Sequence, residues 1–239
     1  MKVFLTLLLL GIWRPFTSEP LVIQPGDRII RYDRIRPAHE FYKNVIRDSA
    51  GNIRYEFMME NMSFVDSAKG RIIFARSRQV PAGQFSTDTS VTDLQLKPVR
   101  MHEIHYQRGV SFDMEFGATA ATVITDRKGV MSTKEYPMKA GYFEDNMIEY
   151  IFGWLALKKG VVYRLDNFNK DTPEPSDPYE LEYVFDDEWD LAPGHRTLYR
   201  VFRFVHGKTT GHIWIDNETN SIVKTVAVFP GGSYFLTRQ

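Results

Sequence analysis

Apolar and polar residues alternate with a period of two through most of the chain after residue 37. The clearest case is Val110, Phe112, Met114 and Phe116, which are separated by Ser111, Asp113 and Glu115. This alternation predicts a β-strand with one buried and one solvated face, as in an antiparallel sheet. The same reasoning predicts strands at residues 41–46, 53–64, 71–79, 101–106, 120–125, 130–136, 179–185, 198–204, 211–216, 221–229 and 233–237.

Turn-forming residues separate these predicted strands. The cluster 48–52 (Asp-Ser-Ala-Gly-Asn) and the cluster 217–220 (Asn-Glu-Thr-Asn) each lie between two strand-like segments. Such residues favour tight turns, so each cluster predicts a β-hairpin. A chain of successive hairpins is typical of an all-β protein.

One segment has the period of a helix instead. Ile148, Ile151, Phe152 and Leu155 are spaced i, i+3, i+4 and i+7, which places them on one side of a helix. Asp145 is positioned to cap the start, and the cations and glycine of 158–160 are typical of an end. We therefore expect a helix from Asp145 to Leu157.

These elements predict an all-β fold with one inserted helix. The preferred architecture is a strongly curved antiparallel sheet, a half-barrel or open barrel, with the helix packed on its concave face. Residues 19–239 are expected to form one β-rich domain. The apolar stripe of the helix is expected to cover the sheet face that carries Phe112, Met114 and Phe116.

The first eighteen residues have the layout of a secretory signal peptide. Lys2 is followed by an apolar run of about eleven residues, which Arg14-Pro15 ends. The small residues Thr17 and Ser18 then offer a cleavage site before Glu19. A run of this length is too short to cross a membrane core of roughly 30 Å as a helix. We expect an exported mature protein that begins near Glu19, and a periplasmic one in a Gram-negative host.

Composition narrows the function. The chain has 30 basic and 30 acidic residues. A chain without net charge lacks the excess of positive charge that is typical of nucleic-acid-binding proteins. It has no cysteine, which excludes disulfides, thiol catalysis and thiolate metal sites. No nucleophile elbow, phosphate loop or dinucleotide fingerprint is present.

His102 and His105 have the most metal-like spacing in the chain. On a strand, residues three apart point to opposite faces and lie about 10 Å apart, so the two rings could not share an ion. We expect ordinary strand residues here, with no metal and no cofactor. Catalytic residues are not predicted, although a site assembled from distant residues stays open.

Aromatic residues and methionine are abundant, with 17 Phe, 12 Tyr, 4 Trp and 9 Met. One interpretation is that they fill a large β core. The other is an apolar concave face that accepts an acyl chain, because methionine is common at adaptable apolar surfaces. The candidate ligand-binding face and its lid are Phe112, Met114, Phe116, Ile148, Ile151, Phe152 and Leu155.

Several short motifs between roughly residues 88 and 237 resemble a family of exported bacterial proteins that carry a domain of unknown function. They are Asp93-x-x-Leu96-x-Pro98, the segment from Leu155 to Tyr163, and the hairpin from Trp214 to Lys224. That family is similar in build to the half-barrel lipoprotein carriers of the bacterial envelope. The resemblance implies a curved antiparallel sheet lidded by helices, and it transfers no functional residue.

Three functions remain open at this level. The first is a non-enzymatic envelope protein that binds a lipid, another amphiphile or a membrane-associated protein partner. The second is a structural or assembly component whose apolar face is filled by its own helix. The third is a hydrolase. An empty pocket would favour the first, a filled core the second, and a cleft with a perturbed histidine or carboxylate the third.

Overall fold

The computed structural model describes residues 19–138, 141–169, 177–192 and 195–239. Most of them lie in β-strands. The strands are β1 (Leu21–Ile23), β2 (Ala38–Asp48), β3 (Ile53–Asp66), β4 (Arg71–Val80), β5 (Gly83–Asp93), β6 (Pro98–His105), β7 (Val110–Phe116), β8 (Ala120–Arg127), β9 (Val130–Pro137), β10 (Phe143–Glu144), β11 (Val162–Leu165), β12 (Asn167–Phe168), β13 (Tyr179–Ala192), β14 (His195–His206), β15 (Thr209–Asp216), β16 (Ile222–Phe229) and β17 (Gly232–Arg238). The described helices are η1 (Tyr32–Arg34), η2 (Asp145–Met147) and α2 (Ile148–Phe152).

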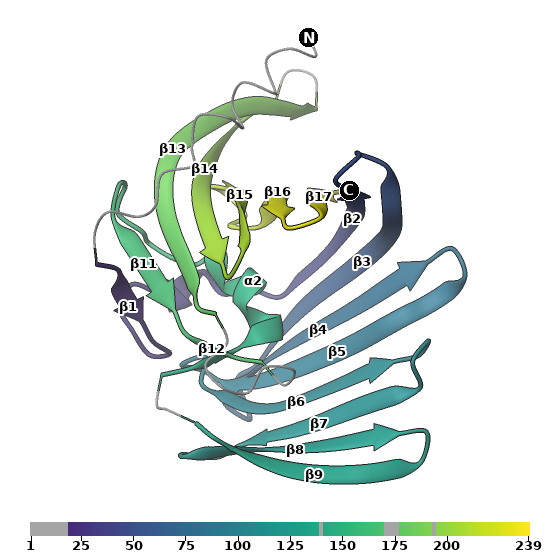
Figure 1. Cartoon of the computed structure of the whole chain (residues 1–239). Helices are drawn as coiled ribbons and strands as arrows, with labels where there is room; N and C mark the ends of the chain where they lie inside the picture. Colours follow the sequence, from purple (N-terminus) through teal and green to yellow (C-terminus); the bar gives the residue numbers. More distant parts are fainter. Residues whose placement is uncertain (1–18, 139–140, 170–176, 193–194) are drawn as a thin grey trace.

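Fifteen of these strands form one sheet in the order β1-β11-β13-β14-β15-β16-β17-β2-β3-β4-β5-β6-β7-β8-β9. Neighbours pair antiparallel, except for the parallel pair β1 and β11 at one edge. The pairing of β17 with β2 joins the last strand of the chain to the series of consecutive hairpins from β2 to β9. Figure 1 shows the strands from β13 to β3 as a strongly curved part of the sheet, with β4 to β9 continuing as a flatter stack. The predicted curved antiparallel sheet is confirmed.

Most predicted strands are present, and the hairpin of β2 and β3 pairs as expected. In the predicted strand at residues 179–185, the alternation places Tyr179, Leu181, Tyr183 and Phe185 on one apolar face, and this prediction is wrong for Phe185. Tyr183 pairs with Phe202, whereas Phe185 pairs with Val201, the residue just before Phe202 in the sequence. This register shift is a bulge, which moves Phe185 to the other face of the sheet.

The helical segment is shorter than predicted. It consists of η2 and α2 and ends at Phe152 rather than Leu157. The cap is Glu144, not Asp145, because the Glu144 carboxylate accepts a hydrogen bond of 2.9 Å from the backbone amide of Asn146. After the helix, the backbone of residues 154–156 hydrogen-bonds to residues 29 and 31 instead of continuing the turn. Residues 19–37, the lead-in segment before β2, thus supply the partners that a longer helix would have used.

The apolar stripe of the helix is fully buried, but not where it was predicted. Ile148, Ile151, Phe152 and Leu155 are at most 1% exposed and belong to the main core cluster. That cluster draws on β4, β11 and β13–β16, with Phe74, Leu165, Leu181, Phe202, Phe204 and Ile213 among its members. Figure 1 places α2 inside the curve of the sheet, beside these strands.

Phe112, Met114 and Phe116 belong to a second core cluster, with Met101, Val123 and Phe168. Phe116 contacts Phe168 of β12 edge-to-face, with ring centroids 5.7 Å apart. The prediction that the helix covers this face is therefore wrong. Alternation identifies a buried face, but it does not say which element covers that face.

One prediction falls on residues that the structure does not describe. The proposed signal peptide, residues 1–18, lies outside the described residues. None of the described helices is long and apolar enough to cross a membrane.

Candidate functional site

Two adjoining cavities lie beside α2 within the curve of the sheet. The apolar cavity has a volume of about 280 Å³ and is lined by Ile46, Glu149, Phe152, Tyr179, Phe204, His206, Thr209, Ile213, Ile222, Thr225, Ala227, Phe229 and Tyr234. The polar cavity has a volume of about 300 Å³ and is lined by residues of β2, β3, β17, α2 and the turn before β16. Glu149 and Ile222 line both, so the two cavities are neighbours.

Strand alternation builds the wall of the apolar cavity. Ile213 pairs with Thr225, and Ala227 pairs with Tyr234, which in turn pairs with Ile46. These residues therefore share one face of β15, β16, β17 and β2, and the curl of the sheet turns that face inward. Small side chains at positions 225 and 227 leave room between the sheet and the helix.

Phe152 of α2 forms the opposite wall. Its ring is 1% exposed and lies edge-to-face against Tyr179, with centroids 5.7 Å apart. Tyr179 stacks on His206 with centroids 4.0 Å apart. Burial raises the pKa of the Tyr179 hydroxyl well above its ordinary value, so this hydroxyl stays uncharged.

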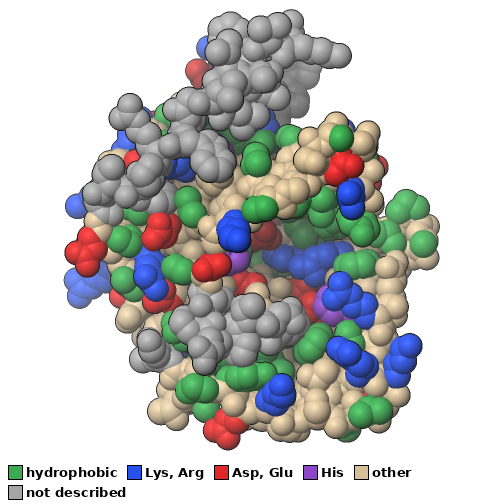
Figure 2. All heavy atoms as spheres, viewed as in Figure 1, with side chains coloured by type: hydrophobic (Ala, Val, Ile, Leu, Met, Phe, Trp, Pro, Cys, Tyr) green, Lys and Arg blue, Asp and Glu red, His purple; other side chains and the backbone are tan. Residues whose placement is uncertain are grey.

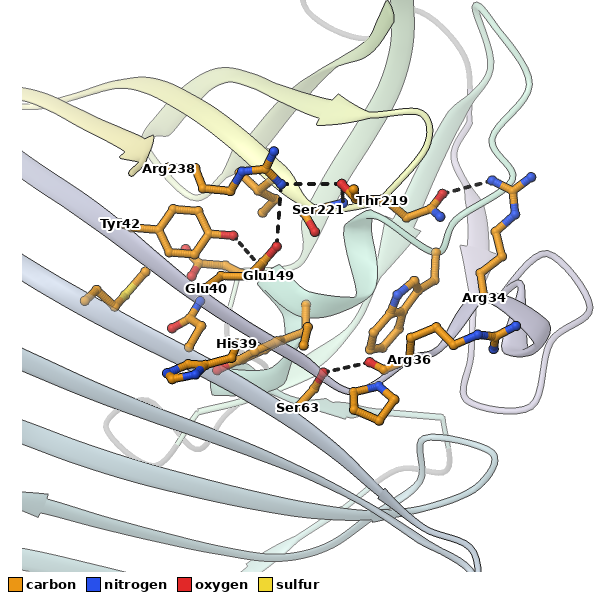
Figure 3. A pocket seen from close by; sticks show the side chains of 18 of the residues that line it. Arg34, Arg36, His39, Glu40, Tyr42, Ser63, Glu149, Thr219, Ser221 and Arg238 are labelled. Carbon is orange, nitrogen blue, oxygen red and sulfur yellow. Dashed lines mark hydrogen bonds and ion pairs between the residues drawn. The ribbon is translucent and has the colours of Figure 1, made fainter. Parts of the chain in front are cut away.

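Figure 3 shows the polar cavity, where ionisable side chains from distant parts of the chain point toward one another. The Tyr42 hydroxyl donates a hydrogen bond of 2.6 Å to Glu40, and Arg238 lies 3.7 Å from Glu40. Burial and the neighbouring Glu40 raise the pKa of Tyr42. The mouth of this cavity also carries Arg34 and Arg36, so charged groups of both signs surround it.

Arg76 of β4 connects α2 to the sheet through Glu149 of the helix and Asn61 of β3. Its guanidinium is 2.9 Å from the Glu149 carboxylate and 3.2 Å from the Asn61 amide oxygen. Burial opposes the charge of Arg76, but Glu149 and Asp88 hold its pKa above the ordinary value. In the space-filling view, Lys or Arg side chains are visible deep in the hollow beside Asp or Glu side chains (Figure 2).

Asn44 lies between the two cavities along β2, in line with Tyr42 of the polar cavity and Ile46 of the apolar cavity. It is completely buried, and neither atom of its amide group has a hydrogen-bond partner among the described residues. A buried amide left in this state is a group that water or the polar part of a ligand can satisfy.

A row of polar side chains crosses the inner face of β5. Ser86, Asp88, Ser90 and Thr92 are all at most 3% exposed. Asp88 forms an ion pair of 2.9 Å with Arg78, and burial still raises the pKa of its carboxyl. Strand β5 was not predicted, because its buried face has no apolar residue. The alternation of small polar residues at 86, 88, 90 and 92 is the signal that could have revealed it.

Glu144 of β10 lies against this row, next to Ser90, and its carboxyl is strongly perturbed. Burial raises its pKa to about 8, while hydrogen bonds from Ser90 and from the Asn146 amide lower it. The Ser90 hydroxyl lies 2.5 Å from the Glu144 carboxyl. Glu144 lines neither cavity and caps η2, so its contacts assign it to holding the helix on the sheet.

The predicted site residues are only partly brought together. Phe152 lines the apolar cavity, whereas Ile148, Ile151 and Leu155 are packed in the core around it. Phe112, Met114 and Phe116 lie in the second cluster and line neither cavity. Sequence reasoning missed the lining from β14 to β17, because only the curl of the sheet turns that face toward the helix.

The two histidines with metal-like spacing lie on β6, as predicted. The His102 ring is 3.0 Å from Asp113, and the His105 ring is 2.7 Å from Glu103. In the part of the chain that the structure describes, no group of three or more histidine or acidic side chains could hold a metal ion.

Comparison with known proteins places this fold. A crystal structure of a beta-barrel-like protein of domain of unknown function DUF1849 from Brucella abortus is similar, with a TM-score of 0.57 and 12% sequence identity over 86% of this chain and 97% of that chain. This similarity shows the fold alone. A relationship to the lipoprotein carriers is not shown by these matches. No curated protein matches the chain. Residues 46–237 match the family described as protein of unknown function DUF3108, and the chain therefore belongs to that family.

Proposed function

We propose that this protein is an exported, non-enzymatic protein of the cell envelope that binds a single-chain amphiphile. The observation that carries the proposal is the apolar cavity between Phe152 and the inner face of β14–β17. Ligand sites are typically concave, mostly apolar and provided with a few polar groups. This cavity has that composition, with aromatic and aliphatic walls and the polar cavity next to it.

Size favours one short chain over a larger lipid. Small-molecule sites begin at roughly 300 Å³, and the apolar cavity has about 280 Å³. The apolar tail would lie against Phe152, Phe204 and Ala227. Its polar end would lie toward Glu149 and the polar cavity, where hydrogen-bonding groups are available.

A structural role is the competing function, and one observation favours it. Four stripe residues of the helical segment are buried to 1% exposure or less, so the helix already fills part of the hollow. A hydrolase is less well supported. Its best candidate group, Glu144, is fully engaged by Ser90 and by the amide of Asn146.

Urea unfolding of the mature chain, with and without decanoic acid or a lysophosphocholine, tests the proposal. A ligand that binds only the folded state raises the free energy of unfolding, by about 2.7 kcal/mol at a free concentration of about one hundred times Kd. Ala227→Leu adds three carbons to the wall of the apolar cavity and should abolish this rise. Ala82→Leu, which adds the same bulk at an exposed turn, should retain it.

Two results would count against the proposal. One is no stabilisation of the wild-type chain by either amphiphile below its micelle concentration. The other is the same stabilisation in the Ala227→Leu and Ala82→Leu variants, because ligand would then bind away from the apolar cavity.

A further inference from the structure

A third cavity lies where α2 ends and the lead-in segment crosses it. It has a volume of about 310 Å³ and is lined by Arg31, Arg34, Gly153, Trp154, Leu155, Ala156, Arg200 and Asn217. Three of these eight residues are arginines, and no acidic residue lines the cavity. We call it the arginine cavity. Its positive charge distinguishes it from the apolar cavity, so it should bind a different class of ligand.

Two of the arginines converge on one atom. Arg34 donates a hydrogen bond of 2.9 Å to the side-chain oxygen of Asn220, and Arg200 donates one of 3.2 Å to the same oxygen. Asn220 has a positive φ of 59°, and its carbonyl oxygen is so close to Gly153 that a Cβ there would come within 1.6 Å of it. The turn is thus held tightly against the helix end, and the two guanidinium groups are fixed as neighbours.

Neither guanidinium has a carboxylate partner within ion-pair distance in the described part of the chain. Arg200 is half-buried, and its other hydrogen bonds go to the backbone carbonyls of Gly153 and Leu155, each at 3.0 Å. Burial lowers the pKa of Arg200, and repulsion from Arg34 lowers it further, although Asp186 acts in the opposite direction. Two like charges held together in this way are stabilised by an anion.

Arg31 differs from this pair. Its guanidinium makes two hydrogen bonds to the Asp33 carboxylate, of 3.0 and 2.8 Å, so its charge is already neutralised. The positive charge available to a ligand therefore comes from Arg34 and Arg200. A guanidinium offers five N–H donors, and Arg34 uses one of them in the described contacts.

We infer that Arg34 and Arg200 form a binding site for a phosphate group at the C-terminal end of α2. Paired guanidinium groups match the oxygens of a phosphate. Arg34 can offer its Nε and Nη2 donors as a fork of two parallel hydrogen bonds, whereas Arg200, with three N–H groups engaged, adds its charge and single hydrogen bonds. The cavity gives the group room beside Trp154. Figure 3 shows Arg34 reaching toward the turn that carries Thr219 and Ser221. The inference does not depend on the apolar cavity, which shares no lining residue with the arginine cavity, although Arg34 and Trp154 also line the polar cavity.

Calorimetric titration of the mature chain tests the site, with inorganic phosphate and dihexanoyl phosphatidate as probes. We expect saturable binding with one phosphate group per chain and a Kd in the millimolar range or below. Arg34→Gln removes one charged donor and should weaken binding about tenfold or more. This variant loses only the single bond to Asn220, so folding should be preserved, and circular dichroism checks that point.

Arg31→Gln is the matched control. It removes a cation from the same cavity, but the charge of that cation is already neutralised by Asp33. We expect this variant to bind nearly as well as wild type. Equal affinity for the two probes would identify free phosphate as sufficient, and tighter binding of phosphatidate would identify a lipid headgroup. No saturable binding of either probe, or equal weakening in the Arg34 and Arg31 variants, would overturn the inference.

Discussion

Truncation of Phe152 measures how closely this side chain is packed where it faces the apolar cavity. The ring is 1% exposed, so Phe152→Ala removes a buried side chain from the main core cluster. Buried Phe→Ala changes cost about 3–5 kcal/mol, and the spread reflects a cavity contribution of about 24 cal/mol per Å³. A side chain that already faces a void has fewer partner atoms to lose on that side. Because Phe152 lines a cavity of about 280 Å³, we expect a loss near the lower end, about 3 kcal/mol.

Phe143→Ala is the matched control. Phe143 belongs to the same cluster, is 0% exposed and lines neither of the two cavities beside the helix. Its truncation should cost about 5 kcal/mol, because the side chain is completely buried and faces neither cavity. Urea unfolding of the two variants without ligand measures both losses. Equal losses at the upper end would refute the reasoning, since Phe152 would then be packed as tightly as Phe143.

Three further outcomes are expected. Gly153→Ala should destabilise the protein despite the better helix propensity of alanine, because its Cβ would come within 1.6 Å of the Asn220 carbonyl oxygen; thermal unfolding that shows a gain would contradict this packing. The Glu144 pKa of about 8 is above the unfolded value, so Glu144 should contribute stability that is present at pH 4 and is lost as the pH rises through 8. Unfolding of Glu144→Gln across this range should show a weaker decline than wild type, and an identical pH profile would refute the assignment. Asn44→Leu removes a buried amide without described partners and should leave stability unchanged or raise it by about 1 kcal/mol; a clear loss in urea unfolding would show that water or another group satisfies the amide.

The strands were predictable where the side chains on their buried face are apolar. Val110, Phe112, Met114 and Phe116 mark β7 from end to end, since each inward position is a large apolar residue. Strand β5 was not predicted, because its inward positions are polar and are buried through contacts such as the ion pair of Asp88 with Arg78. Those partners lie on another strand, so their effect cannot be read locally.

The helix was predictable from its stripe, but its surroundings were not. Its length depends on residues 29–31, which bind the backbone that follows Gly153. Its location depends on the pairing of β17 with β2, a contact between segments almost two hundred residues apart that closes the curl. Phe152 was therefore identified as a candidate, whereas the strands that face it across the apolar cavity were not.

A crystal structure of the mature chain with a terminally brominated decanoic acid tests the central claim most directly, because anomalous scattering from bromine locates the end of the tail. Our account predicts one bromine site in the apolar cavity, near Phe152, Phe204 and Ala227, that is absent from crystals of the Ala227→Leu variant. Bromine found only on the outer surface, or a cavity with no bound chain at saturating ligand, would contradict it.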